Sequence, residues 1–384
     1  MNFLTGKRIL LISPQPWDHI FISKHHYAEE LARNNNQVFF LQPPRGNSLQ
    51  VTKITSLENN PGIHLISWRP LVPKALQIRS GFLHKRLILA QAKRLRHKVG
   101  SDFDVVWSFG CSLYPDLTVF GPAYRIYHPV DPLINKSQIK VADSADLIMS
   151  VSNSILSSFD DQSYIDKTLL VNHGLSREFE ELAKTDASFS GEDVSNLSIG
   201  YFGNLNRIII DIDLWEKLVT NQSQVKFHFW GPYKKSGRFA TKMTQFKNVF
   251  LHGVKDKQTL VKEVASMDVF MLLYKPHKIL SDRSNSHKIL EYLSTGKVVV
   301  SVPIEACEKI RHLLIMPQED DSEIQLLLQE TLDQIEQLNT PELCHARKTY
   351  ASQFTYANNL QYIDNWISAR VNAAREPNQP AKHS

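Results

Sequence analysis

RSNSHKILEYLSTGKVVVS, residues 283–301, is the stretch that decides how this chain of 384 residues folds. Ser284 and Asn285 have side chains that accept hydrogen bonds from free amides, so they predict the start of a helix. Gly296 predicts the end of that helix, because glycine adopts a positive φ without strain. The three valines that follow favour a buried strand. The stretch therefore predicts a helix, a turn and a strand of a parallel α/β domain.

The start of this helix has the chemistry of a phosphate site. Unpaired amides and the positive end of the helix dipole meet there, so a diphosphate is expected at Ser284, Asn285, Ser286 and His287. Glu291 lies about two turns further on, and its carboxylate can accept the paired hydroxyls of a ribose. Together these groups predict a site for a nucleoside diphosphate. The alternative for Glu291 is a solvated position on the helix surface.

Strand-like runs alternate with helical stretches throughout the chain, which is typical of parallel α/β domains, and the length predicts about two of them. In the first half, strands are expected at 8–13, 38–41, 64–67, 104–107, 125–127, 147–151 and 168–171, and helices at 24–34, 80–99 and 152–158. In the second half, strands are expected at 198–202, 226–230, 249–251, 269–273, 298–302 and 313–316. The domains are expected at 1–183 and 197–349, with a polar linker at 184–196, a helix at 350–371 and a disordered tail at 372–384.

The composition is that of a soluble globular protein, with 42% hydrophobic and 22% charged residues. No apolar run is long enough to predict a membrane span. Pro14 and Pro16 follow the apolar run near the start, which is expected to be a core strand and not a signal peptide. The three cysteines are far apart, which argues against disulfides and zinc and favours a reducing cytoplasm.

Positive charge is concentrated in residues 74–98, which hold eight Lys and Arg and no Asp or Glu, interleaved with apolar residues. One interpretation is a basic amphipathic surface that contacts an anionic membrane or a polyanionic acceptor. Another is a solvated helix face over the core. Nucleic-acid binding is the weakest interpretation, because no nucleic-acid motif accompanies the charge, and we expect no nucleic-acid partner.

The segment LEYLSTGKVVV (290–300) resembles the donor-binding signature of GT-B glycosyltransferases, in particular the large retaining family 4, or glycosyl transferases group 1. That signature consists of a glutamate, seven residues and a second glutamate, followed by a small-residue helix, a glycine and an apolar strand. Glu291 matches the second glutamate, and Arg283 occupies the position of the first. The segment NSHK (285–288) is similar to the Asn-Pro-x-Lys start found in some members, such as enzymes resembling the teichuronic-acid transferases.

Six further segments resemble parts of the family's sequence pattern, in the family's order. They are 13–17, 171–175, 199–205, 229–232, 249–254 and 268–274. The resemblance implies an α/β fold of the GT-B architecture, with two Rossmann-like doubly wound domains facing each other across a cleft. It also implies that the helix at 350–371 crosses back to the first domain.

On the donor side, the resemblance implies a nucleotide-sugar bound by the second domain. Gly203 and Asn204 would approach the diphosphate, and Gly253 with Val254 would contact the base. Arg207 and Lys288 would neutralise the diphosphate as it leaves, so that neither a metal nor another cofactor is needed. Core packing is the alternative for Val254, and a surface role is the alternative for both cations.

On the acceptor side, a glycan or lipid-linked acceptor is expected in the first domain. Trp17 and Asp18 on the first loop and His26 on the first helix are candidates to contact it, with packing in the domain as the alternative for His26. His128 and Asp131 lie on a proline-rich loop after a predicted strand and are candidates to position the acceptor or to act as a general base.

The resemblance implies a metal-independent glycosyltransferase that retains anomeric configuration and acts in polysaccharide or cell-envelope glycoconjugate synthesis. It is expected in the cytoplasm, in peripheral contact with the inner face of the membrane. Two other functions are open: a nucleotide-sugar epimerase or phosphorylase of the same fold, and a catalytically silent scaffold or partner subunit, for which Arg283 in place of a glutamate is the argument.

Overall fold

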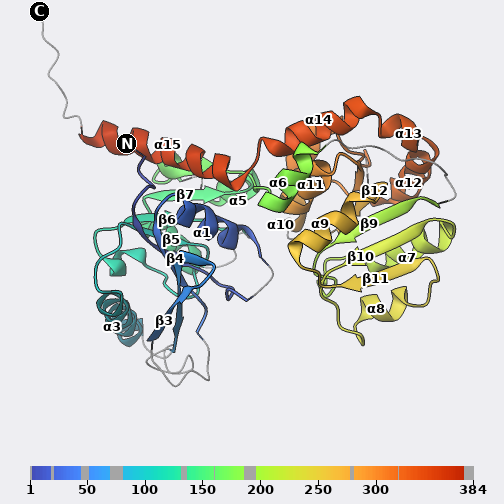
Figure 1. Ribbon diagram of the computed structural model, residues 1–384. Coiled ribbons are helices and arrows are strands. Elements are labelled where there is room, and N and C mark those ends of the chain that lie inside the picture. The colour runs from blue at the N-terminus through green and yellow to red at the C-terminus, as the bar shows by residue number, and fades with distance from the viewer. Residues whose placement is uncertain are drawn as a thin grey trace, which may run out of the picture. The chain divides into compact units, whose positions relative to one another are not determined.

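The computed structural model of this protein describes residues 2–18, 21–44, 52–69, 81–130, 136–159, 161–185, 196–276, 281–318 and 320–375. The chain divides into two compact units, one of Met1–Asn172 with Tyr356–Ser384 and one of His173–Thr355 (Figure 1). Each unit is built on a mainly parallel sheet with helices packed against it, so the prediction of two doubly wound α/β domains is confirmed.

The sheet of the first unit has eight strands in the order β3-β4-β2-β1-β5-β6-β7-β8. The strands are β1 (Arg8–Ile12), β2 (Gln37–Leu41), β3 (Thr52–Leu57), β4 (Asn60–Trp68), β5 (Val105–Ser108), β6 (Tyr124–Tyr127), β7 (Leu147–Ser150) and β8 (Thr168–Leu170). All neighbours pair in parallel except β3 and β4, which form an antiparallel hairpin at the edge. The inner strands are buried on both faces, which explains their continuous apolar sequences.

The sheet of the second unit has five parallel strands in the order β11-β10-β9-β12-β13. They are β9 (Ser198–Phe202), β10 (Lys226–Trp230), β11 (Val249–Gly253), β12 (Val269–Leu272) and β13 (Val298–Ser301). The order of strands reverses at β9, which lies between β10 and β12. Open α/β sheets bind their ligands beyond the carboxyl ends of the strands at such a reversal, so this edge of the sheet is where a site is expected.

Helices cover both sheets. In the first unit they are α1 (Ser23–Arg33), α3 (Gly81–Val99), α4 (Lys136–Ser144), α5 (Asn153–Leu156) and α15 (Tyr356–Arg375). In the second they are α6 (Arg177–Lys184), α7 (Ile212–Asn221), α8 (Arg238–Met243), α9 (Lys257–Ala265), α10 (Ser281–Ser284), α11 (His287–Ser294), α12 (Ile324–Asp333), α13 (Ile335–Leu338) and α14 (Pro341–Ser352). Among the described residues, none of these helices combines the length and the apolar character needed to cross a bilayer.

The division between the units differs from the predicted boundaries at 183 and 349. The first unit ends at Asn172, because α6 packs with the second unit: Phe179 of α6 stacks on Phe202 of β9 at 5.3 Å between ring centroids. The predicted linker at 184–196 therefore lies inside the second unit, and residues 186–195 of it are outside the described residues.

The C-terminal elements also begin later than predicted. The second unit extends through α14 to Thr355, and the first unit resumes at Tyr356 with α15, whose Leu360, Ile363 and Ile367 are buried in the first unit's core. The predicted tail at 372–384 begins within α15, and its residues 376–384 are outside the described residues.

One strand of the structure was missed, and one predicted strand is wrong. Strand β3 was not predicted, because its residues are half-buried or exposed at the sheet edge and show little apolar pattern. The predicted strand at 313–316 is a single bridge from Ile315 to Val300. The other predicted strands of both halves are present, with ends that differ by a few residues.

Candidate active site

Glycines bring bare backbone to the carboxyl edge of the second unit's sheet. Gly203 follows β9, Gly231 follows β10 and Gly253 ends β11, with φ of +154°, +127° and +72°. A Cβ on Gly231 would overlap the carbonyl oxygen of Gly203, and a Cβ on Gly203 would overlap Lys288 and lie 3.0 Å from the Tyr201 hydroxyl oxygen. Only glycine fits at either position, so the ends of β9 and β10 lie close to each other without side chains between them.

Helix α11 places its N-terminus and three of the predicted site residues, His287, Lys288 and Glu291, in the second unit. The N-cap is Ser286, not Ser284 or Asn285, and its side chain makes no capping hydrogen bond. The predicted cap residues fall before it, since Ser284 ends the short helix α10 and Asn285 lies in the turn between the helices. The Ser286 side chain therefore leaves the start of α11 uncapped, and within the first turn the Ile289 amide donates to the Ser286 carbonyl at 3.1 Å.

His173 contacts the turn before α11. Its ring lies 5.7 Å from that of His287, and it hydrogen-bonds the backbone of Asn285. Burial is the main reason why the pKa of His173 is lowered to about 4; the hydrogen bond to the Asn285 backbone opposes this shift, and the nearby Lys288 contributes to it. The imidazole is therefore neutral at physiological pH, and it serves to fix the turn.

Lys288 joins α11 to the end of β9. Its side chain is only 4% exposed and lies against Gly203, and its Nζ donates a hydrogen bond to the Tyr274 hydroxyl at 3.1 Å. Burial raises the pKa values of Tyr201 and Tyr292 well above that of a free tyrosine, so these neighbouring hydroxyls stay uncharged. The phenol groups near the Lys288 ammonium are therefore polar but uncharged. Among the described side chains, no carboxylate forms an ion pair with this ammonium.

Glu291 is half-buried one turn after Lys288 on α11. Burial raises the pKa of its carboxyl to about 7, Lys288 and Lys257 oppose this rise, and Glu178 adds to it. Its carboxylate accepts no hydrogen bond within the described part of the chain. Hydrogen-bond donors of a ligand would stabilise the charged form of this carboxyl group and so lower its pKa.

Arg283, at the position of the missing glutamate, is bound within the protein. Its guanidinium pairs with Asp321 and donates to the carbonyl of Tyr274, and the two side chains of the pair are 15% and 20% exposed. The position therefore holds a structural ion pair that ties α10 to the segment before α12.

The remaining donor-side predictions lie on loops at the same edge. Val254 is 68% exposed beside Gly253, and Ile208, which the sequence reading did not single out, is 86% exposed on the loop after β9. Arg207 is exposed on that loop, and its amide donates to the carbonyl of Asn204 at 3.3 Å. The exposed side chains of Val254 and Ile208 offer apolar surface on which an apolar part of a ligand could pack.

The acceptor-side predictions lie in the first unit, where aromatic rings connect several of them. His26 is 9% exposed and stacks on Tyr356 of α15 at 4.7 Å, and His128, at the carboxyl end of β6, is 4.7 Å from the ring of Phe109. Trp17 packs edge-to-face on Phe40 at 5.0 Å. Asp18 is exposed next to this cluster, and Asp131 is outside the described residues.

Two residues that the sequence reading did not single out belong to these sites. Lys24 of α1 is 1% exposed, with its Nζ hydrogen-bonded to Gln15 and 5.8 Å from the ring centroid of Phe109. Gly231 is the other, because its contact with Gly203 spans two strands. The Gly-Pro pair at 231–232 was the only sequence signal for Gly231, and a helix lysine such as Lys24 carries no signal of burial.

The sequence Asp-x-Asp, which often holds metals in proteins, occurs at residues 102–104 and 211–213. The carboxylates of Asp102, Asp211 and Asp213 accept hydrogen bonds from other groups of the protein. Asp102 accepts from the Arg96 guanidinium at 2.7 Å. Asp211 caps α7, and Asp213 accepts from Arg238 at 2.7 Å. No group of three or more His, Cys, Asp and Glu side chains that could hold a metal ion is found within the described residues.

No model of a protein family matches this sequence, and no curated protein sequence matches it significantly. Solved structures of similar fold include Anabaena HepE in complex with UDP and glucose, which is 15% identical with a TM-score of 0.68, covering 94% of this chain and 100% of that one. The trehalose-6-phosphate synthase OtsA is 12% identical with a TM-score of 0.64, covering 97% and 99%. Sucrose-phosphate synthase from Thermosynechococcus elongatus is 11% identical with a TM-score of 0.66, covering 96% and 100%. The chain therefore has the GT-B fold.

Proposed function

We propose that this protein is a glycosyltransferase that takes a sugar from a nucleoside-diphosphate donor and transfers it to an acceptor hydroxyl. The observation that carries the proposal is the contact of buried Lys288 with the bare backbone of Gly203, one helical turn from the half-buried Glu291. The GT-B fold supports it, and one structure of similar fold, HepE, holds UDP and glucose.

The proposed donor site uses each of these groups for a different part of the ligand. The diphosphate lies over Gly203 and Gly231 and against the start of α11, where backbone amides can approach it without side chains between. The carboxylate of Glu291 accepts the ribose hydroxyls. The exposed apolar side chain of Val254 packs on the base.

Lys288 supplies the main electrostatic contribution to the reaction. When the bond between the sugar and the diphosphate breaks, negative charge grows on the leaving phosphate oxygens. A cation held in place before the reaction stabilises this charge more effectively in a buried site than in water. With Lys288 and the exposed Arg207 in this role, the reaction proceeds without a metal ion, and anomeric configuration is retained.

The acceptor binds to the first unit in this proposal, beside the aromatic cluster of Trp17, His26 and His128. Helix α3, whose buried residues belong to the other of the first unit's two core clusters, has an exposed basic face with Arg86, Lys93 and Lys98. Its apolar residues Ala92 and Leu95 are buried in the unit's own core. Contact of α3 with an anionic lipid surface or a polyanionic acceptor would therefore be electrostatic, in polysaccharide or glycoconjugate synthesis at the inner face of the membrane.

Nucleotide binding tests the proposal first. Isothermal titration calorimetry with UDP, GDP, ADP and CMP should find one nucleotide that binds the wild type and binds Glu291→Ala at least about tenfold more weakly. The control is Glu336→Ala, which removes an exposed glutamate of α13. Equal binding to both variants, or no binding to the wild type, would overturn the donor site.

Turnover of the matching nucleotide-sugars then tests the activity. Sugar transferred to an added glycan acceptor supports the transferase. Release of the free nucleotide with an altered sugar and no acceptor identifies an epimerase. Nucleotide binding without turnover of any nucleotide-sugar identifies a silent scaffold and overturns the transferase proposal.

A further inference from the structure

The Tyr274 hydroxyl holds the ammonium of Lys288 beside the bare backbone of Gly203. The Lys288 Nζ donates to this hydroxyl at 3.1 Å and lies 5.8 Å from the centroid of the ring, so the contact is with the oxygen and not with the face of the ring. The same Nζ lies 3.3 Å from the position that a Cβ on Gly203 would take. An ammonium has three N–H donors, and Lys288 makes no other hydrogen bond to a residue that the structure describes, so two of its donors remain for a ligand.

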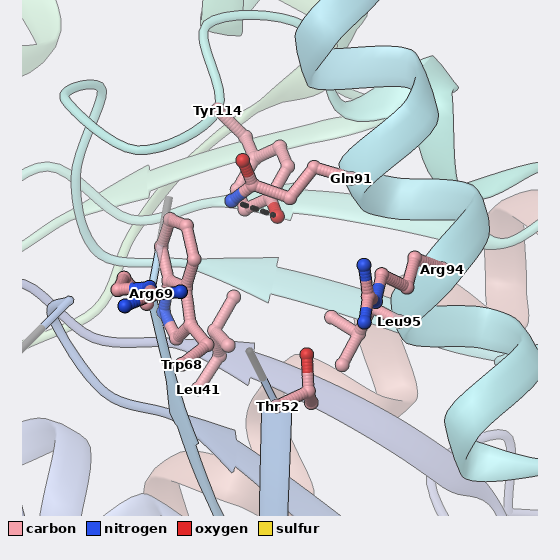
Figure 2. A pocket seen from close by; sticks show the side chains of 8 residues that line it. All are labelled: Leu41, Thr52, Trp68, Arg69, Gln91, Arg94, Leu95 and Tyr114. Carbon is pink, nitrogen blue, oxygen red and sulfur yellow. Dashed lines mark hydrogen bonds between the residues drawn. The ribbon is translucent and has the colours of Figure 1, made fainter. Parts of the chain in front are cut away.

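Buried polar side chains in the small pocket of the first unit are bonded differently. Figure 2 shows this pocket between α3 and the ends of β2 and β4. The Trp68 indole N–H, the one donor of that side chain, donates to the Gln42 carbonyl at 2.7 Å, and the Gln91 amide donates to the Tyr114 hydroxyl at 3.3 Å. Both groups thus have acceptors within the protein, whereas the Lys288 ammonium has an acceptor for one of its three donors.

The backbone of Tyr274 is fixed by three neighbouring groups. Tyr274 lies two residues beyond β12 and forms an antiparallel bridge with Ile210, and backbone hydrogen bonds of 3.1 and 2.7 Å join the residues next to them. The Tyr274 carbonyl accepts from the Arg283 guanidinium, which Asp321 binds at 3.1 Å. Since Tyr274 is also only 2% exposed, its phenol has a defined place before any ligand binds.

The anchor of the ammonium is a phenol and not a carboxylate. A phenol hydroxyl accepts a hydrogen bond without bringing a negative charge to the lysine. Within the described ranges, no Asp or Glu side chain pairs with Lys288, so its charge is not cancelled by the protein. A cation that is fixed in direction and keeps its charge is what a leaving diphosphate requires.

We infer that Tyr274 is a positioning residue of the donor site, whose hydroxyl aims the Lys288 ammonium at the leaving diphosphate. The inference deepens the proposed function and rests on it for the identity of the ligand. Without the hydroxyl, the lysine keeps its charge but loses its fixed direction. Stabilisation of the transition state then falls more than binding of the donor, because only the transition state depends on exact placement of the charge.

Steady-state kinetics of Tyr274→Phe with the nucleotide-sugar test this role. We expect kcat to fall at least about tenfold while KM changes by less than about twofold. The matched control is Tyr292→Phe, which also removes a buried hydroxyl near the site, but one that accepts from the Phe202 amide at 3.4 Å and not from Lys288. Equal kcat values for the two variants would overturn the inference.

A double-mutant cycle shows whether Tyr274 acts through the lysine. In the background of Lys288→Met, the further change Tyr274→Phe should alter kcat by less than about twofold, because no ammonium is left to position. A loss in this background as large as the loss in the wild type would mean that the hydroxyl acts on the structure in another way, and it would overturn the inference.

NMR of the ligand-free protein labelled with ¹⁵N-lysine keeps the inference separate from the proposed function. The Lys288 ammonium signal is identified by its absence in Lys288→Met. A hydrogen bond slows exchange of ammonium protons with water, so Tyr274→Phe should speed this exchange several-fold and Tyr292→Phe should not. Unchanged exchange in Tyr274→Phe overturns the inference whatever the activity. Faster exchange, in a protein whose wild type neither binds a nucleotide nor turns over a nucleotide-sugar, overturns the proposed function and leaves Tyr274 as the anchor of Lys288.

Discussion

The side chain of Lys288 occupies the space that a Cβ on Gly203 would take, so a buried ammonium and a bare strand end lie in contact. The two residues come from α11 and from the loop after β9, which are far apart in sequence and meet because β9 is the central strand of its sheet. The contact gives the proposed donor site both its cation and its access to backbone.

Gly203→Ala should disrupt this contact. The added methyl group overlaps the Lys288 side chain and forces it to move, and a non-glycine residue is strained at this φ. We expect nucleotide affinity to fall at least about tenfold, together with a loss of stability of about 1–3 kcal/mol. The matched control is Gly6→Ala, which also has positive φ but open space around it and lies in the first unit. If both variants bind nucleotide equally, Gly203 has no role in the site.

Lys288→Met should lower turnover much more than nucleotide binding. Methionine fills nearly the same volume, so the fold and the packing on Gly203 are retained while the charge is lost. Removing one group that stabilises a developing oxyanion costs about 10²–10³ in kcat. Steady-state kinetics with the nucleotide-sugar measures this, with Lys309→Met as control for loss of an exposed cation. A change confined to KM would assign Lys288 to ground-state binding.

Nucleotide binding should depend on pH through Glu291. The pKa of its carboxyl is about 7 in the free protein, and ribose hydroxyls that donate to the carboxylate would lower it in the complex. Binding then releases a proton. The affinity therefore rises with pH, by at most about tenfold per pH unit, up to about pH 7 and is constant above that pH. Titrations in buffers of different ionisation enthalpy measure the released proton. Glu291→Gln retains only the pH dependence of the nucleotide's own phosphate, and proton uptake by the wild type would contradict this role.

The same carboxyl should destabilise the ligand-free protein at high pH. A pKa raised from 4.5 to about 7 means that folding favours the protonated form, so the penalty is absent below pH 4.5 and is complete above pH 7. Glu291→Gln should therefore raise the free energy of unfolding at pH 8 and leave it unchanged at pH 4. Urea denaturation at both pH values, with Glu336→Gln as the exposed control, measures the difference. An equal effect at both values would point to packing instead of charge.

A glutamate at position 283, as in the donor-binding signature that this segment resembles, should destabilise the protein. Arg283→Glu places a carboxylate beside Asp321 in a largely buried position, and breaking a buried pair costs about 3–5 kcal/mol. Urea denaturation should show this loss, and the charge-swapped double variant Arg283→Glu/Asp321→Arg should recover part of it. A single variant as stable as the wild type would show that the pair contributes nothing to α10.

Much of the fold could be predicted from the sequence, because apolar runs bounded by glycine and polar turns specify parallel strands directly. Strands β9 and β10 lie where they were predicted, since buried strands need continuous apolar residues. Strand β3 could not be found in this way: it pairs only with β4 at the sheet edge, and half of its side chains face solvent. The helix was predicted to start at Ser284 and Asn285 but starts at Ser286. Three adjacent polar residues are all suitable caps, and only the tertiary structure selects among them.

The candidate site was predictable where one segment carries it. Lys288 and Glu291 share a helix, so their spacing alone brings them to one face of it. The contact of Gly231 with Gly203, the hydrogen bond from Lys288 to Tyr274 and the pairing of Arg283 with Asp321 each join separate elements.

The return of α15 to the first unit has a consequence for synthesis of the protein. The second unit, His173–Thr355, is complete in the nascent chain before Tyr356 is added. The first unit began earlier but must wait for the 20 residues of α15, whose Leu360, Ile363 and Ile367 fill its core. On the ribosome, the second unit can therefore mature before the first, and the strands of the first unit keep an uncovered apolar face until α15 has been translated.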